Sequence, residues 1–150
     1  MRAVIQRVNE ASVEVGEQVA GSIGRGLLVF VGISKTDTLR DIDWMVDKIA
    51  NLRIFESEAG KMDESLLDIG GGLLLVSQFT LYGDCRKGRR PSFSDAMEAD
   101  AAKSLFEQFV ERARQKVSLV QTGVFQAMMQ VHLVNDGPVT LIIESPSKAS

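Results

Sequence analysis

Two short, uninterrupted apolar runs constrain the fold of this chain most strongly. One reads Leu27-Leu28-Val29-Phe30-Val31 and the other reads Leu73-Leu74-Leu75-Val76. Neither run offers a polar residue to water, which is typical of a strand covered on both faces. A chain with two such strands must place other elements on both sides of a sheet, so the sequence predicts a layered domain.

The helical spacing of apolar residues predicts two main helices, at residues 38–52 and 95–117. Thr38 is a suitable N-cap for the first helix. The apolar face of this helix consists of Ile42, Met45, Val46 and Ile49. The second helix has acidic first turns and basic last turns, as the helix dipole favours. Its expected buried face consists of Ala102, Leu105, Phe106, Phe109, Val110 and Ala113.

Strands are expected through most of the remaining chain, including residues 4–23, 128–134 and 139–143. Because several of these strands are adjacent in sequence, much of the sheet should be antiparallel. The predicted fold is an α/β domain of α+β-like character, with layered, largely antiparallel sheets and two main helices. It should span residues 1–150 as a single domain. The residues from Ser145 onward are expected to fray.

The composition excludes several classes of protein. The 150 residues are 45% hydrophobic and carry a net charge of −3, unlike a disordered chain. A single cysteine, Cys85, rules out an internal disulfide framework. No apolar run approaches the roughly 20 residues that span a membrane, and charges at Arg2 and Arg7 are unlike a signal peptide. We therefore expect a soluble protein of a reducing compartment.

The charge balance argues against nonspecific coating of nucleic acid, because proteins that do so are usually strongly basic. A local basic run is nevertheless present, with Arg86, Lys87, Arg89 and Arg90 around Gly88. Alone, such a run indicates either a solvated loop or a local phosphate contact.

Common catalytic signatures are weak. Gly70-Gly71-Gly72 precedes a strand, whereas a phosphate-binding loop follows a strand and opens a helix, so we expect a turn there. A catalytic triad or a zinc site would have to use His132, the only histidine, which is expected in the middle of a strand. Cys85 has no evident base nearby, and no metal site is expected.

Two polar segments are more informative. Ser77-Gln78-Phe79-Thr80 ends a buried strand, and sites are commonly built where strands end. Asn135-Asp136-Gly137-Pro138-Val139-Thr140 contains the residues of a tight turn. Taken singly, the first segment has two interpretations: polar residues that end a strand, or a functional site. The second alone predicts only a turn, with an ordinary trans bond before Pro138.

Together, in this order and some sixty residues apart, the two segments resemble the signature motifs of the D-aminoacyl-tRNA deacylase (D-tyrosyl-tRNA deacylase) family. The likeness covers essentially the whole chain, including the opening Met1-Arg2-Ala3-Val4-Ile5-Gln6-Arg7-Val8 and Gly26-Leu27-Leu28-Val29. The resemblance implies a hydrolase that cleaves the ester joining a D-amino acid to the terminal adenosine of tRNA. It also implies a cytoplasmic homodimer with active sites at the subunit interface and with no metal or organic cofactor.

The resemblance further assigns roles to residues. The catalytic residues would be Ser77, Gln78, Phe79 and Thr80. The substrate-binding residues, which would reach into the partner's site, are Asn135, Gly137, Pro138, Val139 and Thr140. A cis bond between Gly137 and Pro138 would turn two carbonyls toward the substrate ammonium, so that an L side chain would strike main chain. Glycyl-tRNA has no side chain to clash and should also be hydrolysed.

The same resemblance gives the basic run a partner, because Arg86, Lys87, Arg89 and Arg90 would hold phosphates of the tRNA acceptor stem. The alternatives to an enzyme are an RNA-binding module without turnover and a purely structural dimer.

Two catalytic routes stay open at this stage. Thr80 is a candidate nucleophile, but a threonine nucleophile needs an activating base. In the other route the site positions a water, and the neighbouring ribose hydroxyl of the substrate assists. The main-chain N–H of Phe79 or Thr80 would then stabilise the oxyanion.

Overall fold

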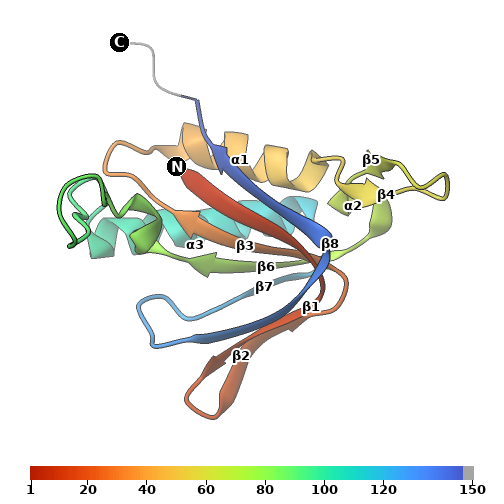
Figure 1. Cartoon of the computed structure of the whole chain (residues 1–150), viewed down its shortest axis with the longest axis horizontal. Coiled ribbons are helices and arrows are strands. Elements are labelled where there is room, and N and C mark those ends of the chain that lie inside the picture. Colours follow the sequence, from red (N-terminus) through yellow and green to blue (C-terminus); the bar gives the residue numbers. More distant parts are fainter. Residues whose placement is uncertain (147–150) are drawn as a thin grey trace.

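Six strands form one curled, mixed sheet in the structure, a computed structural model that describes residues 1–146 (Figure 1). They are β1 (Arg2–Val15), β2 (Gln18–Ile23), β3 (Gly26–Gly32), β6 (Gly72–Ser77), β7 (Val120–Thr122) and β8 (Gln130–Glu144). The order is β2-β1-β3-β6-β7, with β8 paired to β1. Strand β1 pairs antiparallel with β2, β3 and β8, whereas β3, β6 and β7 run parallel. The expectation of a largely antiparallel sheet is therefore only partly right, because helical crossovers join the parallel strands.

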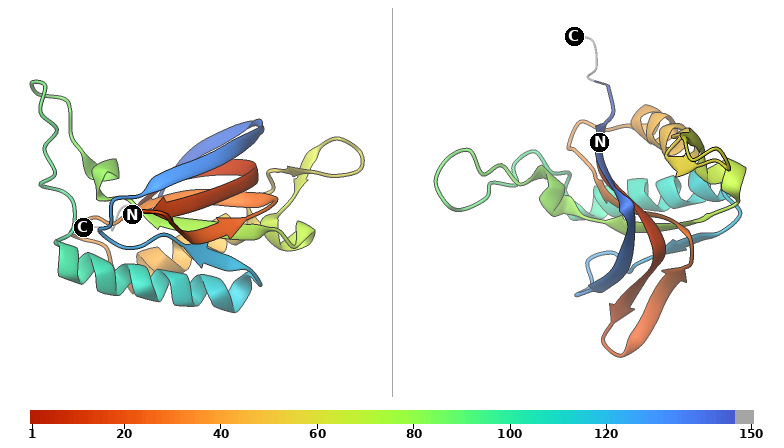
Figure 2. Two further views of the ribbon diagram at one scale, coloured as in Figure 1. Left: turned by 90° about the horizontal axis from the view of Figure 1, so that it is seen from below. Right: turned by 45° about the vertical axis from the view of Figure 1, so that its right-hand side comes forward.

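The two main helices lie on one face of this sheet (Figure 2). Helix α1 (Leu39–Asn51) confirms the predicted element: the Asp41 carboxylate accepts a hydrogen bond of 2.8 Å from the Thr38 N–H. Helix α3 (Ala99–Lys116) begins four residues later than predicted, because the Glu98 side chain caps it. Four minor elements complete the chain: β4 (Phe55–Glu56), β5 (Met62–Glu64), α2 (Leu66–Ile69) and the 3₁₀ helix η1 (Phe79–Tyr82).

Two apolar clusters, one on each face of the central strands, explain why the runs at 27–31 and 73–76 contain no polar residue. The larger cluster packs α1 and α3 against the sheet. The smaller cluster fills the inside of the curl and includes Val13, Leu28, Leu74 and Val76. Burial on both faces fixes the central strands and thereby the position at which β6 ends.

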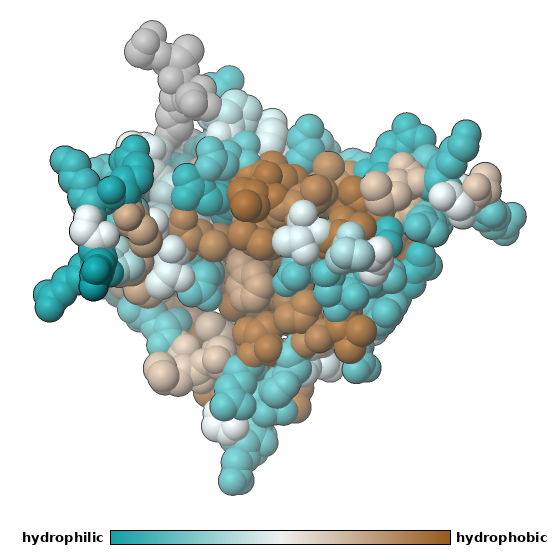
Figure 3. Space-filling view, viewed as in Figure 1, coloured by the Kyte–Doolittle hydropathy of each residue, from teal (hydrophilic) through white to brown (hydrophobic). Residues whose placement is uncertain are grey.

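The sheet face opposite the helices, which also carries the smaller cluster, has an apolar row in which Val4 lies opposite Phe30 on one side and Ile142 on the other. The Ile142 side chain is 71% exposed. Figure 3 shows hydrophobic side chains gathered at the centre of this face. An exposed apolar patch of this kind is typical of an interaction surface.

Ser145 is held in place, contrary to the expectation that the chain frays from this residue. Its hydroxyl accepts a hydrogen bond from the Met1 nitrogen at 2.9 Å and donates one to the Asp41 carboxylate at 2.8 Å. The remainder of that predicted tail, from residue 147, lies outside the described residues. Over residues 1–146, no helix is long and apolar enough to cross a membrane.

Candidate functional site

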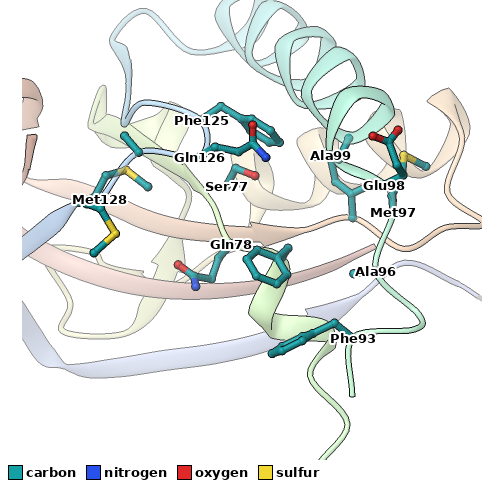
Figure 4. Close-up of a pocket in the computed structure, with 15 residues that line it drawn as sticks. Ser77, Gln78, Phe93, Ala96, Met97, Glu98, Ala99, Phe125, Gln126 and Met128 are labelled. Atoms are coloured by element: carbon teal, nitrogen blue, oxygen red, sulfur yellow. The ribbon is translucent and has the colours of Figure 1, made fainter. Parts of the chain in front are cut away.

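A pocket of about 610 Å³ lies where β6 ends (Figure 4). Its walls are the end of β6 with the start of η1 (Ser77, Gln78 and Phe79), residues 93–102 around the start of α3, and residues 125–129 between β7 and β8. The volume is in the range of sites for small molecules. Three of the four expected catalytic residues thus line one cavity, and Thr80 follows them directly.

The chain turns sharply after β6. The Gln78 N–H donates to the Val31 carbonyl of β3 at 2.8 Å, and the Gly83 N–H donates to the Thr80 carbonyl at 2.9 Å, which closes the short η1 helix. The Gln78 carboxamide donates to the Thr80 hydroxyl. The first N–H groups of such a helix have no partner inside it, so those of Phe79 and Thr80 are available to an oxygen atom of a ligand.

Most of the pocket wall is apolar. The rings of Phe79 and Phe93 meet edge to face, with centroids 5.1 Å apart. The Glu98 carboxylate is already used, because it accepts from the backbone N–H groups of Asp100 and Ala101. A pocket with aromatic walls and few polar groups suits a flat, largely apolar ligand that is oriented by a few hydrogen bonds.

Among the described residues, the hydrogen-bond partner of the Thr80 hydroxyl is the Gln78 carboxamide, which is not a base. The nearby Tyr82 phenol stays protonated, because burial and then the charge of Asp37 raise its pKa well above the usual value. His132 does not line the pocket and instead lies 3.5 Å from Glu14. Among residues 1–146, no group of three or more His, Cys, Asp or Glu side chains is placed to hold a metal ion.

The second segment, residues 135–140, forms a wide bulge within β8 and not the predicted turn between two strands. Thr140 pairs with Gln6 and Asn135 pairs with Val8, so four residues of β8 lie opposite Arg7 alone. The Asn135 carboxamide spans the base of this bulge, donating to the carbonyls of Arg7 at 2.9 Å and Val139 at 3.2 Å. Residues 136–139 therefore project from the strand as a braced backbone loop.

The expected cis bond between Gly137 and Pro138 is wrong for this structure, since no peptide bond of the described chain is cis. The backbone changes direction instead at Gly137, whose φ of 113° is a conformation that favours glycine. Pro138 has no N–H to lose from the strand ladder. The two carbonyls that a cis bond would turn to the same side are therefore not arranged in this way. The contact with the substrate ammonium that was expected from them is not supported.

Sequence reasoning missed Arg7, the residue beneath the bulge. Its side chain is only 6% exposed. The Nε atom donates to the Asp136 carbonyl at 3.2 Å, and Nη1 donates to the Ile54 carbonyl at 2.7 Å. An arginine in a strand pattern gives no local signal of such a role, because both partners are distant in sequence.

Within one chain the structure does not bring the two segments together. Ser77 pairs with Val31, which pairs with Ala3, which in turn pairs with Ile143. The bulge is therefore on the third strand from β6, about 14 Å away across the sheet at the usual strand spacing. It is also displaced along the strands, because it lies opposite Arg7 and not Ala3. None of residues 135–140 lines the pocket. A site that uses both segments needs a second copy of the chain.

The basic run lies on a projecting loop (Figure 2). Paired backbone hydrogen bonds of 2.7 and 2.9 Å between Asp84 and Ser92 close its base. Arg86 forms two side-chain hydrogen bonds with the Asp84 carboxylate, at 2.9 and 2.7 Å, and these bonds lower the Asp84 pKa to about 2. Lys87, Arg89 and Arg90 are exposed on the same loop. The loop thus exposes several cations, and its two ends are held together by hydrogen bonds between Asp84 and Ser92.

The glycine run at residues 70–72 and Cys85, which the sequence also singled out, do not line the pocket. Gly70 ends α2 in a left-handed conformation with φ of 62°, so the glycine run is a turn, as predicted. Cys85 is exposed beside the basic run.

Comparison with known proteins identifies the family of the chain. Residues 4–144 match the family model described as D-Tyr-tRNA(Tyr) deacylase. The chain belongs to this family. The resemblance seen in its two motifs is thereby confirmed, and membership makes the chain an enzyme of the deacylase type, a hydrolase of ester bonds.

Similar proteins support the same grouping. The D-aminoacyl-tRNA deacylase of Thermotoga petrophila is 59% identical over 97% of both chains, and that of Chlorobaculum tepidum is 58% identical over 99% of both. Among solved structures, the c-Myc DNA Unwinding Element Binding Protein is 46% identical, with a TM-score of 0.93 over 98% of this chain and all of its own. A probable eukaryotic D-amino acid tRNA deacylase, 18% identical, shares the deacylase fold with a TM-score of 0.84 over 95% of this chain and 98% of its own.

Proposed function

We propose that this protein hydrolyses D-aminoacyl-tRNA to free tRNA and a D-amino acid. The observation that carries the proposal is the pocket at the end of β6, lined by Ser77, Gln78 and Phe79 in a chain of the deacylase family. The same function places the protein in the cytoplasm, where charged tRNA is used.

The pocket fits the terminal adenosine of the substrate. Its apolar walls, with Phe79, Phe93 and Phe125, suit a stacked base. The aminoacyl ester would then lie over the start of η1, beside Thr80. This position brings the ester carbonyl to the available N–H groups of Phe79 and Thr80.

Catalysis in this arrangement uses an attacking water and the substrate's own ribose. The water adds to the ester carbonyl, an N–H of Phe79 or Thr80 stabilises the resulting oxyanion, and the ribose oxygen leaves with a proton. One such donor contributes about 10²–10³ in rate. The adjacent ribose hydroxyl relays the proton, because Thr80 receives its hydrogen bond from an amide that is not a base. Thr80 as nucleophile is the less favoured route for the same reason.

The active form is a homodimer in which each bulge enters the pocket region of the other subunit. Two features support this arrangement: the separation of the two segments within one chain, and the apolar row of Val4, Phe30 and Ile142 on the sheet face opposite the helices. Association of two such faces would remove their apolar side chains from water, which is favourable.

Selection of D over L substrates is steric and is made by the main chain of residues 136–139. Arg7 and Asn135 brace this backbone, so that it does not yield to an L side chain. A preference of 10³ corresponds to about 4 kcal/mol, which a rigid backbone clash can supply. Glycyl-tRNA has no side chain to clash, so it is also a substrate.

The basic loop holds the acceptor stem through phosphates and carries no sequence information. Lys87, Arg89 and Arg90 make these contacts with Arg86, whose pairing with Asp84 also fixes the base of the loop.

A second candidate function is nucleic-acid binding without turnover. The projecting loop favours it, and one similar protein is named for binding a DNA unwinding element. Under this alternative the protein would bind charged and uncharged tRNA equally and leave the ester intact.

The test is to incubate the pure protein with matched D- and L-aminoacyl-tRNA and to follow loss of the ester. Rapid loss from the D substrate alone supports deacylation. Binding to both without ester loss supports the second candidate and overturns the first.

A further inference from the structure

Gln126 has an unusual backbone conformation in the wall of the pocket. With φ of 64°, it is the only residue other than glycine with a positive φ within residues 1–146. It is the third residue of a turn that is closed by a 3.1 Å hydrogen bond from the Ala127 N–H to the Val124 carbonyl. Glycine or asparagine is normal at such a position, and backbone strain of this kind is often found at functional sites.

The residues around Gln126 explain how the strained conformation is maintained. Phe125 packs against the main core and lies 6.3 Å, centroid to centroid, from the Phe106 ring. Met129 packs into the second cluster, inside the curl of the sheet. The turn is thus anchored on both sides, and its conformation is imposed by packing on either side of Gln126.

The Gln126 side chain lines the pocket and is drawn there in Figure 4. Gln126 is exposed at the mouth of the pocket, and within residues 1–146 its carboxamide has no protein hydrogen-bond partner, whereas two neighbouring polar groups are partly used. Gln78 donates to Thr80, and Glu98 caps α3. Gln126 therefore offers both a donor and an acceptor to the pocket, beside the hydroxyl of Ser77.

We propose that the Gln126 carboxamide reads the base edge of the terminal adenine, which rests on the deacylase function proposed above. Its Oε1 accepts from the adenine N6 amino group, and its Nε2 donates to N7. A glutamine carboxamide matches this edge of adenine with two hydrogen bonds. The strained backbone is the means by which the chain presents this group to the pocket, so Gln126 determines base specificity and takes no part in the chemical step.

The proposal predicts that replacing Gln126 changes stability and activity in opposite directions. Gln126→Gly removes the strain together with the carboxamide, so the midpoint of urea denaturation should rise while kcat/KM for the D substrate falls about tenfold. A purely structural glutamine would give the opposite stability result, because its loss would lower the midpoint. Gln115→Ala, on the exposed side of α3, is the matched control and should change neither quantity.

The decisive experiment combines this variant with a substrate change. A D-aminoacyl minihelix that ends in 7-deazaadenosine lacks only the N7 acceptor. We expect the wild-type protein to lose several-fold in kcat/KM on this substrate, as one hydrogen bond predicts, and Gln126→Gly to process it as well as its adenosine counterpart. Equal losses in both proteins, or full activity of Gln126→Gly, would overturn the proposal. Failure of the wild-type protein on the normal substrate would instead overturn the proposed function.

Discussion

Arg7 reaches from β1 to the bulge of β8, where its Nε lies 3.2 Å from both the carbonyl and a carboxylate oxygen of Asp136. The same guanidinium donates to Ile54 at 2.7 Å through Nη1. One buried cation therefore joins the central strand, the β4 region and the loop that we propose selects the substrate. The shape of the bulge depends on a residue far from it in sequence.

Arg7→Met should destabilise the fold and impair the site together. Methionine retains the apolar stem but leaves the oxygens of Ile54 and Asp136 without their donor, so we expect a loss of about 2–3 kcal/mol in the free energy of unfolding. Turnover of D-aminoacyl-tRNA should fall at temperatures where the variant is still folded. Urea denaturation and steady-state kinetics measure the two effects.

Arg25→Met is the control for Arg7. Arg25 is exposed and lies over the Phe55 ring at 5.5 Å, a contact worth about 0.5–1 kcal/mol at such sites. Equal unfolding free energies and equal kinetics in the two variants would show that Arg7 does not brace the bulge.

Gly137→Ala should disturb the bulge directly. An added Cβ would clash with Nη2 of Arg7, and the φ of 113° disfavours any side chain. We expect D-substrate turnover to fall at least tenfold, measured beside L-substrate turnover in the same assay.

Gly16→Ala is the control for Gly137→Ala, because it introduces a side chain at a positive φ without a clash. Its φ is also positive, at 61°, but nothing lies within 4 Å of the added Cβ. This variant should lose about 1 kcal/mol in stability and keep wild-type kinetics. If both alanine variants had the same turnover and selectivity, the bulge would have no part in the site.

Thr80→Ala distinguishes the two catalytic routes. If the substrate's ribose hydroxyl assists, kcat should fall only a few-fold, because the hydroxyl of Thr80 receives a hydrogen bond from Gln78 without being activated by a base. A substrate that ends in 2′-deoxyadenosine should then be nearly inert. Complete loss of activity in Thr80→Ala, with the deoxy substrate still cleaved, would establish Thr80 as the nucleophile.

Replacing Lys87, Arg89 and Arg90 together by glutamine should flatten the salt dependence of tRNA binding. Each lost phosphate contact reduces the slope of log K against log salt by about 0.7–0.9, so the slope of the triple variant should be smaller by about 2–3. Because the Asp84 pKa is lowered to about 2 by Arg86, the pair at the loop base stays intact at neutral and mildly acidic pH and is lost only as the pH falls toward that value. The effect on the slope should therefore be the same at pH 6 and pH 8.

A matched triple variant of Arg40, Lys48 and Lys61, on the helix and hairpin away from the loop, is the control for charge alone. A comparable loss of slope in this control would show that the basic loop makes no specific contact.

Local patterns predicted much of the fold. The burial of 27–31 and 73–76 on both faces and the start of α1 after Thr38 were readable because propensity, capping and periodicity act over a few residues. The end of β6 at Ser77 was readable for the same reason, but only the resemblance to the family marked the segment that follows as a site. That the chain pairs β3, β6 and β7 in parallel follows from long crossovers and could not be read from strand propensity.

The rest of the site depends on contacts that no local pattern encodes. The bulge of β8 is set by its pairing with β1 and by Arg7, more than a hundred residues earlier in the chain. The conformation of Gln126 is imposed by packing around its turn, because glutamine itself disfavours a positive φ. Gly137 and Pro138 lie in this bulge, where the cis bond that the resemblance implied is not found.

A mixed dimer tests most directly the claim that each site takes its pocket from one subunit and its bulge from the other. Ala99→Trp would fill the pocket, since Ala99 lines it at the start of α3, and Gly137→Ala would disturb the bulge. Each variant alone should have little D-aminoacyl-tRNA deacylase activity. Dimers purified with one chain of each kind should regain about half the wild-type activity, because one of their two sites combines an intact pocket with an intact bulge. Mixed dimers as inactive as the two parents would contradict the shared site.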